Sequence, residues 1–227
     1  MSEAVEKVTT WDSLEGEESM AEGHEPAWQS LIGYIGERDL SDKRILDFGC
    51  NRGGFLKALY ARLPYHEALG VDIAEDSVAY ANDHKGEIPC TYAHNRVLAN
   101  EKNSFDLAFS HEVVYLLPDL VAHAREMRAV LKTGGAYYLA IGEYAENPLW
   151  ERWKKTVAEF SPVPPQTYSL QDIAKAFQEN GFGVSVRRMV CDKFLPYDAS
   201  DDKYLLNPME LVDFMTRYMM LFKMTAV

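Results

Sequence analysis

A glycine-rich turn that directly follows an acidic residue constrains this chain more than any other feature. A short apolar run ends at Asp47, the turn follows, and apolar residues then resume at helical spacing. This order predicts a buried strand over 44–47, a loop, and a helix over 54–62. Gly49 and Gly53 permit positive φ and a close approach of the backbone to a ligand.

The charge of this turn indicates which ligand it would bind. A dinucleotide would place its pyrophosphate over the glycines and the helix N-terminus, where the carboxylate of Asp47 would repel it. A second apolar run ends at Asp72, about 20 residues past the turn, where an acid can bind both hydroxyls of a ribose. Asp47 and Asp72 together favour a nucleoside with a positive charge and no phosphate. S-adenosylmethionine is such a compound.

Five segments, in order along the chain, resemble motifs of class I S-adenosylmethionine-dependent methyltransferases. They are residues 45–54 and 70–73, which resemble the first two motifs, then 105–110 in the fourth strand, 117–119 at the start of the next helix, and 131–135 before the fifth strand. The resemblance extends over roughly residues 30–190 and is to the small-molecule, type 11-like branch. Asn51 stands where the family usually has a glycine, and Asn also tolerates positive φ.

The resemblance implies an α/β fold with a doubly wound, mostly parallel seven-stranded sheet. Its strand order would be 3-2-1-4-5-7-6, with the last strand antiparallel and helices on both faces. Outside the turn, we expect helices over 26–37, 75–83, 119–131 and 147–160 and after Ser169, and strands over 68–72, 88–93, 105–110, 136–141, 183–190 and 218–227.

The two ends of the chain differ from its middle. Residues 1–23 are acidic with few apolar side chains, which predicts a partly mobile segment and a candidate lid over the cofactor or substrate. Residues 24–227 would form a single domain, in which 192–217 is an insertion suited to a substrate lid through Phe194, Tyr197, Tyr204 and Leu205. The Met-rich end favours a buried strand, with an interface helix as the alternative, so a monomer and a homodimer both stay open.

Ligands in open α/β sheets bind beyond the carboxyl ends of the strands. By family resemblance, the cofactor-binding residues are Asp47, Gly49, Cys50, Asn51, Gly53, Asp72, Ile73, His94, Asn95 and Ser110. His111 is the leading candidate for a general base, because its ordinary pKa lies near neutral pH; packing on the cofactor without proton transfer is an equal alternative. Glu143 and Tyr144, after the fifth strand, are the next candidates, and Glu112 and Gly142 would lie on the same side of the pocket.

The composition excludes several classes of function. A net charge of −12 argues against a nucleic-acid substrate, because phosphate binding depends on Lys and Arg. Three widely spaced cysteines form neither a disulfide framework nor a Cys-x-x-Cys metal site, so we expect no metal and a reducing compartment. The acidic start of the chain and the lack of an apolar run of about 18 residues predict a cytoplasmic protein with no membrane partner.

The resulting prediction is an enzyme that uses S-adenosylmethionine, with S-adenosylhomocysteine as product, to methylate a small-molecule acceptor at oxygen or nitrogen. One alternative is a nicotinamide-dependent oxidoreductase on a similar sheet. Another is a non-catalytic protein that binds S-adenosylmethionine and recruits a partner.

Overall fold

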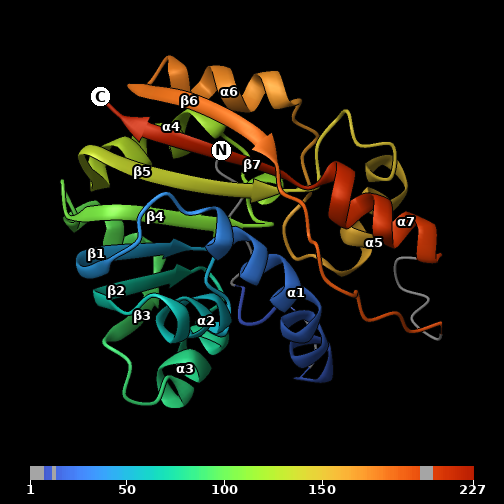
Figure 1. Ribbon diagram of the computed structural model, residues 1–227, viewed down its shortest axis with the longest axis horizontal. Helices are drawn as coiled ribbons and strands as arrows, with labels where there is room; N and C mark the ends of the chain where they lie inside the picture. The colour runs from blue at the N-terminus through green and yellow to red at the C-terminus, as the bar shows by residue number, and fades with distance from the viewer. Residues whose placement is uncertain (1–7, 12–13, 200–206) are drawn as a thin grey trace.

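The computed structural model describes residues 8–11, 14–199 and 207–227, and a seven-stranded sheet forms its centre (Figure 1). The strand order is β3-β2-β1-β4-β5-β7-β6. Only β7 runs antiparallel to its neighbours, β5 and β6, so the predicted fold class is confirmed. The strands are β1 (Leu40–Phe48), β2 (Tyr65–Asp72), β3 (Cys90–His94), β4 (Phe105–His111), β5 (Leu131–Ile141), β6 (Phe182–Arg188) and β7 (Met220–Ala226).

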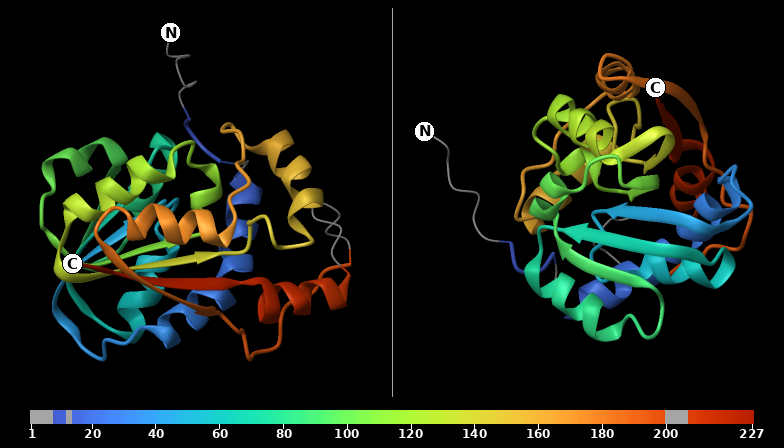
Figure 2. Two further views of the ribbon diagram at one scale, coloured as in Figure 1. Left: turned by 90° about the horizontal axis from the view of Figure 1, so that it is seen from above. Right: turned by 90° about the vertical axis from the view of Figure 1, so that its left-hand side faces the viewer.

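Helices cover both faces of the sheet, as the two views in Figure 2 show. The helices are α1 (Leu14–Tyr34), α2 (Gly54–Arg62), α3 (Glu75–His84), α4 (Leu120–Val130), α5 (Trp150–Phe160), α6 (Leu170–Gln178) and α7 (Pro208–Asp213). Short 3₁₀ turns span Asn95–Asn100 and Val114–Leu116, and a π-helical turn spans Phe214–Tyr218. Within the described ranges, none of these helices is long and apolar enough to cross a bilayer.

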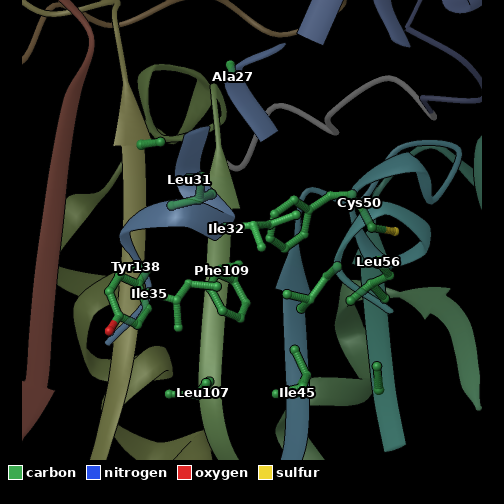
Figure 3. Close-up of a cluster of buried hydrophobic side chains, with 14 of the residues drawn as sticks. Ala27, Leu31, Ile32, Ile35, Ile45, Cys50, Leu56, Leu107, Phe109 and Tyr138 are labelled. Atoms are coloured by element: carbon green, nitrogen blue, oxygen red, sulfur yellow. The ribbon is translucent and has the colours of Figure 1, made fainter. Parts of the chain in front are cut away.

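Alternating side chains of the strands divide the core into two layers. In β4, Leu107 and Phe109 pack toward α1 and α2, whereas Ala108 between them packs toward α4 and α6. Figure 3 shows the first layer, where Leu31 and Ile35 lie over Phe109. This period of two is what parallel strands buried on both faces require.

Helix α1 differs most from its prediction. The pattern predicted a helix over 26–37, but α1 begins at Leu14 and continues through Pro26, so the expected boundary at residue 23 falls inside it. Proline removes one backbone hydrogen bond of a helix. The burial of both ends of α1 compensates, because Ala27 and Leu31 pack on the sheet and Glu17 is 1% exposed. Residues 1–7 lie outside the described residues.

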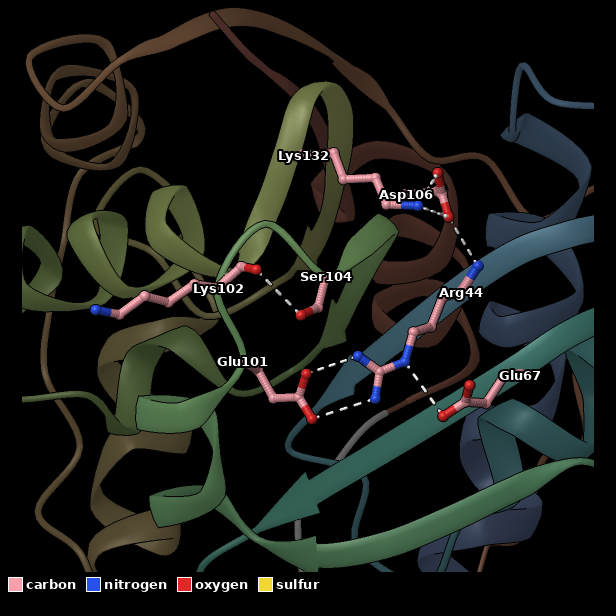
Figure 4. A network of polar contacts seen from close by, with 7 residues as sticks. All are labelled: Arg44, Glu67, Glu101, Lys102, Ser104, Asp106 and Lys132. Atoms are coloured by element: carbon pink, nitrogen blue, oxygen red, sulfur yellow. Dashed lines mark hydrogen bonds and ion pairs between the residues drawn. The ribbon is translucent and has the colours of Figure 1, made fainter.

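Charged residues hold the strands together at the end where β1 and β4 begin (Figure 4). The Arg44 guanidinium donates to both carboxylate oxygens of Glu101, at 2.6 and 3.2 Å. The backbone N–H of Arg44 donates to Asp106, 2.9 Å away, which Lys132 also contacts at 2.8 Å. This network therefore lies at the opposite end of the sheet from the residues that follow β1, β2 and β4.

The C-terminal region ends in the predicted buried strand and not in the alternative, an interface helix. Strand β7 lies between β5 and β6, and α7 with the π-helical turn precedes it. In the predicted lid insertion, Phe194 is fully exposed and Tyr197 is 46% exposed. Tyr204 and Leu205 lie outside the described residues, so the lid stays a prediction.

Candidate functional site

The glycine-rich turn adopts the backbone conformation that its sequence predicted. The φ angles of Gly49, Asn51 and Gly53 are 79°, 44° and 77°, all in the left-handed region. The backbone N–H groups of Gly49 and Cys50 donate to the carbonyl of Val71, at 2.8 and 3.0 Å. The turn after β1 is thereby attached to the end of β2, which positions Asp72 beside it.

Asp72 is the centre of a hydrogen-bond network at the edge of the turn. It is 4% exposed, and its Oδ2 accepts from the backbone N–H of Asn51 at 2.8 Å. Its Oδ1 accepts from the backbone N–H of Ala74 at 2.9 Å and from the indole N–H of Trp11 at 3.0 Å. A side chain from the N-terminal segment thus occupies one acceptor position of this carboxylate.

Asp47 lies on the other side of the turn and is 3% exposed. Its Oδ2 has no hydrogen-bond partner among the residues that the structure describes. Burial, and secondarily the nearby charge of Asp72, raise the pKa of Asp47 to about 8. A buried carboxylate without a partner is costly to ionise, so this position favours a cation.

Residues 8–11, which we call the N-terminal strap, lie across this region. The carbonyls of Val8 and Thr9 accept from the backbone N–H groups of Glu75 and Asp76, at 3.4 and 2.8 Å. These donors belong to the first turn of α3, where helical N–H groups need partners from outside the helix. The strap is therefore fixed both at α3 and, through Trp11, at Asp72.

Glu17 of α1 connects the strap to the glycine-rich turn. Its Oε1 accepts from the hydroxyl of Thr10 at 2.9 Å and from the backbone N–H of Trp11 at 3.0 Å. Its Oε2 accepts from the side-chain amide of Asn51 at 2.6 Å and lies 3.9 Å from Nε of Arg52. One buried carboxylate thus couples the strap, α1 and the turn.

Two histidines form the floor of the same region. The rings of His24 and His111 meet edge to face, with centroids 4.9 Å apart. Burial lowers the pKa of His24 to about 4, and burial together with the charge of His24 lowers the pKa of His111 well below its ordinary value. Both imidazoles are therefore neutral at physiological pH, and each has one ring nitrogen that can accept a hydrogen bond.

These groups surround one cavity of about 160 Å³, which the turn, α1, the end of β4 and the end of α5 enclose. Of the predicted site residues, Asp47, Gly49, Cys50, Asn51, Asp72, His111 and Glu112 line it. Gly53, Ile73, His94, Asn95, Ser110, Gly142, Glu143 and Tyr144 do not.

Glu143 and Tyr144, which were predicted to face the cavity, do not line it in this structure, and their catalytic role stays a prediction. The side chains of Phe214 and Met219 fill the space beside Gly142, and they cover the carboxyl end of β5. Glu143 turns back to accept from the N–H of Gly142 at 3.2 Å, and burial raises the pKa of Glu143 to about 7. Tyr144 packs in the core layer formed by α4 and α6.

Several other predicted residues that lie outside the cavity make hydrogen bonds or packing contacts within the fold. The His94 ring accepts from the backbone N–H of Arg96 at 3.2 Å and so caps the turn that includes Asn95. The carbonyl of Gly53 accepts from the hydroxyl of Tyr92 at 3.2 Å. Ser110 is fully buried in the sheet.

Helix α1 supplies cavity residues that the sequence interpretation missed. They fall at positions i, i+3, i+4, i+7 and i+11, which share one helical face: Glu17, Met20, Ala21, His24 and Trp28. This spacing is the signal of a single helical face, and it is readable in the sequence once the helix is extended through Pro26. Val157 and Ser161, from the end of α5, complete the wall.

A family model described as a methyltransferase domain matches residues 20–185 of this chain. The chain belongs to that family. The family and the fold confirm the class I, S-adenosylmethionine-dependent methyltransferase that the motifs predicted, and they count against the oxidoreductase.

Solved structures share the whole fold. One is a complex between a methyltransferase activator and a methyltransferase of Haloferax volcanii. A chain of that structure superposes on this protein with a TM-score of 0.79 at 19% identity, over 95% of this chain and 95% of that one. An S-adenosylmethionine-dependent methyltransferase from Mesorhizobium loti gives 0.66 at 18% identity, over 90% of this chain and 98% of that one.

Curated relatives match only part of their length. A ubiquinone biosynthesis O-methyltransferase of Ruegeria pomeroyi is 34% identical over 103 residues, which are 44% of this chain and 41% of the relative. A trans-aconitate 2-methyltransferase of Rhodopseudomonas palustris is 25% identical over 109 residues, 48% of this chain and 42% of the relative. The chain therefore spans less than half the length of these two relatives.

Proposed function

We propose that this domain transfers a methyl group from S-adenosylmethionine to oxygen or nitrogen of a small-molecule acceptor. The observation that carries the proposal is the pair of buried carboxylates, Asp47 and Asp72, on either side of the glycine-rich turn and in the same cavity as the neutral imidazole of His111. The curated relatives include methyltransferases named for small acceptors, which supports this class of substrate.

The described residues suit this cofactor. Asp72 would accept from the ribose hydroxyls, and Asp47, which has an unpartnered Oδ2, would stabilise positive charge. A phosphate ligand does not suit two buried carboxylates at the turn. When bound, the cofactor supplies an electrophilic methyl group.

His111 is the best-placed proton acceptor. Its Nε2 is buried with no hydrogen-bond partner among the described residues. Because its pKa is lowered by burial, the ring is already in the neutral form that a general base needs. The cavity walls beside it include Trp28 and Val113.

Substitution of His111 by asparagine, which keeps a polar side chain of moderate size, is expected to lower turnover of an identified acceptor by about 100-fold or more. Binding of S-adenosylhomocysteine should change little, because Asp47 and Asp72 stay in place. Steady-state kinetics combined with calorimetric titration checks both statements. Turnover equal to that of the wild type would remove His111 from proton transfer.

The cavity is small for this ligand. Its 160 Å³ is below the roughly 300–1,000 Å³ of typical small-molecule sites, and Trp11 of the strap and Glu17 of α1 form part of its lining. We infer that the strap moves when the cofactor binds, because the Trp11 indole already donates to Oδ1 of Asp72, the carboxylate that would accept from the ribose hydroxyls. This gives the predicted N-terminal lid a physical basis in residues 8–11.

Replacement of Trp11 by phenylalanine removes the indole donor and keeps an aromatic ring. We expect affinity for S-adenosylhomocysteine to rise by about threefold to tenfold, since one hydrogen bond to a carboxylate no longer competes. Calorimetric titration measures the change. A fall in affinity would contradict the competition and would indicate that the indole contacts the bound ligand.

The proposed function is tested by titrating the protein separately with S-adenosylmethionine and NADH. We expect calorimetric binding of the first and none of the second. Methyl transfer is then assayed by release of S-adenosylhomocysteine across a panel of small hydroxyl and amine compounds. Binding without any product across the panel would favour the non-catalytic alternative, and binding of NADH alone would overturn the proposal.

A further inference from the structure

A second group of cavity residues, outside the glycine-rich turn and the strap, has a distinct chemistry. The end of β4 and the loop after it contribute His111, Glu112, Val113, Tyr115 and Leu116. Helix α1 contributes His24 and Trp28, whose ring centroids lie 4.9 and 6.5 Å from that of His111. We call these residues the acceptor side. It combines one carboxylate, two neutral imidazoles and several aromatic or apolar walls.

Glu112 is the unusual member of the acceptor side. Both of its carboxylate oxygens are buried, and neither has a hydrogen-bond partner in the described part of the chain. Its φ angle is 56°, in the left-handed region that non-glycine residues rarely adopt. Buried carboxylates are normally paired, because an unpaired one loses its hydration without compensation. The side chain therefore lacks a donor that a ligand would supply.

The charges around the cavity indicate what kind of donor is missing. Its lining contains the acidic residues Glu17, Asp47, Asp72 and Glu112, against one cation, Arg52. Arg52 lies 3.9 Å from Glu17 and stacks on Tyr80 at 4.5 Å from the ring centroid. Its Nε and Nη1 have no hydrogen-bond partner among the described residues, but a single guanidinium leaves the lining with an excess of acidic groups. No Lys or Arg of the described residues lines the acceptor side. An anionic acceptor would have no counter-charge there, whereas a cation would meet a carboxylate and aromatic faces.

We propose that the acceptor is an amine, held as its ammonium form by the carboxylate of Glu112 and walled by Trp28 and Tyr115. This inference rests on the proposed function and narrows its oxygen-or-nitrogen acceptor to nitrogen. Glu112 binds the nitrogen, and His111 takes the proton that the nitrogen must lose before it can react. The nitrogen then gains the methyl group, whose bond to sulfur breaks with the electron pair left on sulfur.

Three probes of similar size and different charge test the proposal: benzylamine, benzyl alcohol and benzoate. Each is titrated into protein saturated with S-adenosylhomocysteine, and binding is followed by ligand-observed NMR. We expect benzylamine to bind and benzoate not to bind. Equal or tighter binding of benzyl alcohol or benzoate, or no binding of any probe at millimolar concentration, would overturn the amine assignment.

Substitution Glu112→Gln removes the charge and nearly preserves the shape. It should weaken the binding of benzylamine by about tenfold or more, because the ammonium group loses a charged partner. The affinity for S-adenosylhomocysteine should stay unchanged. Glu151→Gln, at an exposed position of α5, is the matched control and should alter neither. A parallel loss of both ligands in Glu112→Gln would assign this carboxylate to the amino group of the cofactor instead.

The proposed function and the amine assignment fail in different ways. If the wild-type protein binds no S-adenosylhomocysteine, the proposed function is wrong before any probe is added. If it binds S-adenosylhomocysteine and rejects benzylamine, only the amine assignment is wrong. Thermal unfolding of each variant confirms that it is folded, and removal of an unpartnered buried charge at Glu112 should not lower its midpoint.

Discussion

Replacing Asp72 with alanine is expected to weaken binding of S-adenosylhomocysteine by about 100-fold or more, because hydrogen bonds to a charged acceptor contribute about 1.5–3 kcal/mol each. The carboxylate is the proposed acceptor for the ribose hydroxyls. It also orders the site, since it accepts from the backbone N–H groups of Asn51 and Ala74 at 2.8 and 2.9 Å. Losing the ribose contacts and losing the order of the site both weaken binding. Isothermal titration calorimetry measures the affinity.

Two further variants separate binding from folding. Asp72→Asn keeps a side-chain oxygen for one of the two backbone donors, which bond to different oxygens of Asp72, so it should lose affinity while remaining closer to the wild type in thermal stability than Asp72→Ala. Asp106→Ala removes a carboxylate at the opposite end of the sheet, where Asp106 holds Arg44 and Lys132. We expect it to lower the unfolding midpoint and leave ligand affinity unchanged. Wild-type affinity in Asp72→Ala would contradict the assignment of the ribose position.

Substitution of Asp47 by asparagine is expected to stabilise the unliganded protein and to weaken cofactor binding at the same time. The folded state raises the pKa of Asp47 from 3.8 to about 8, so the folded protein binds a proton there that the unfolded chain releases. The resulting penalty is absent below about pH 4 and grows as the pH rises toward about 8. Asparagine carries no such penalty.

The difference in unfolding midpoint between Asp47→Asn and the wild type should therefore be small near pH 5 and largest near pH 8. There it is expected to reach on the order of 10–20 °C for a domain of this size. Thermal unfolding across this pH range measures it. A difference that shrinks as the pH rises would show that the carboxyl is not buried in its protonated form.

The pH dependence of binding follows from the same carboxyl. A bound cation favours the ionised form of Asp47, so wild-type affinity for S-adenosylmethionine should increase with pH up to about pH 8 and then level off. Binding at neutral pH should also release protons, which calorimetry detects as a dependence on the ionisation enthalpy of the buffer. In Asp47→Asn the affinity should be lower, by about tenfold, and independent of pH over this range.

The sheet and the turn were predictable because they depend on short-range patterns. The apolar run before Asp47, the glycines after it and the acid at the end of β2 all follow from local residue order. Their packing partners are neighbouring strands in a strand order that the family resemblance supplied. The fold class therefore agrees with the structure throughout the described residues.

The N-terminal side of the cavity was not predictable from the same patterns. Pro26 indicated a helix start, and acidic residues before it indicated solvent exposure. Glu17 is nevertheless buried, because Asn51 and the strap supply its hydrogen bonds. Those partners are set by tertiary contacts, and Asn51 lies 34 residues away in sequence. Glu143 and Tyr144 lie outside the cavity for a similar reason, since Phe214 of the π-helical turn and Met219 after it pack against Gly142 at the end of β5.

The contact between Trp11 and Asp72 provides the protein with an intrinsic optical reporter. The chain has four tryptophans, and only the Trp11 indole donates to this carboxylate within the described residues. A ligand that displaces the strap moves that indole from a hydrogen-bonded, partly buried position toward water, which should change its emission. Rapid-mixing fluorescence would then follow strap opening in real time without any label, and Trp11→Phe would identify the part of the signal that comes from the strap.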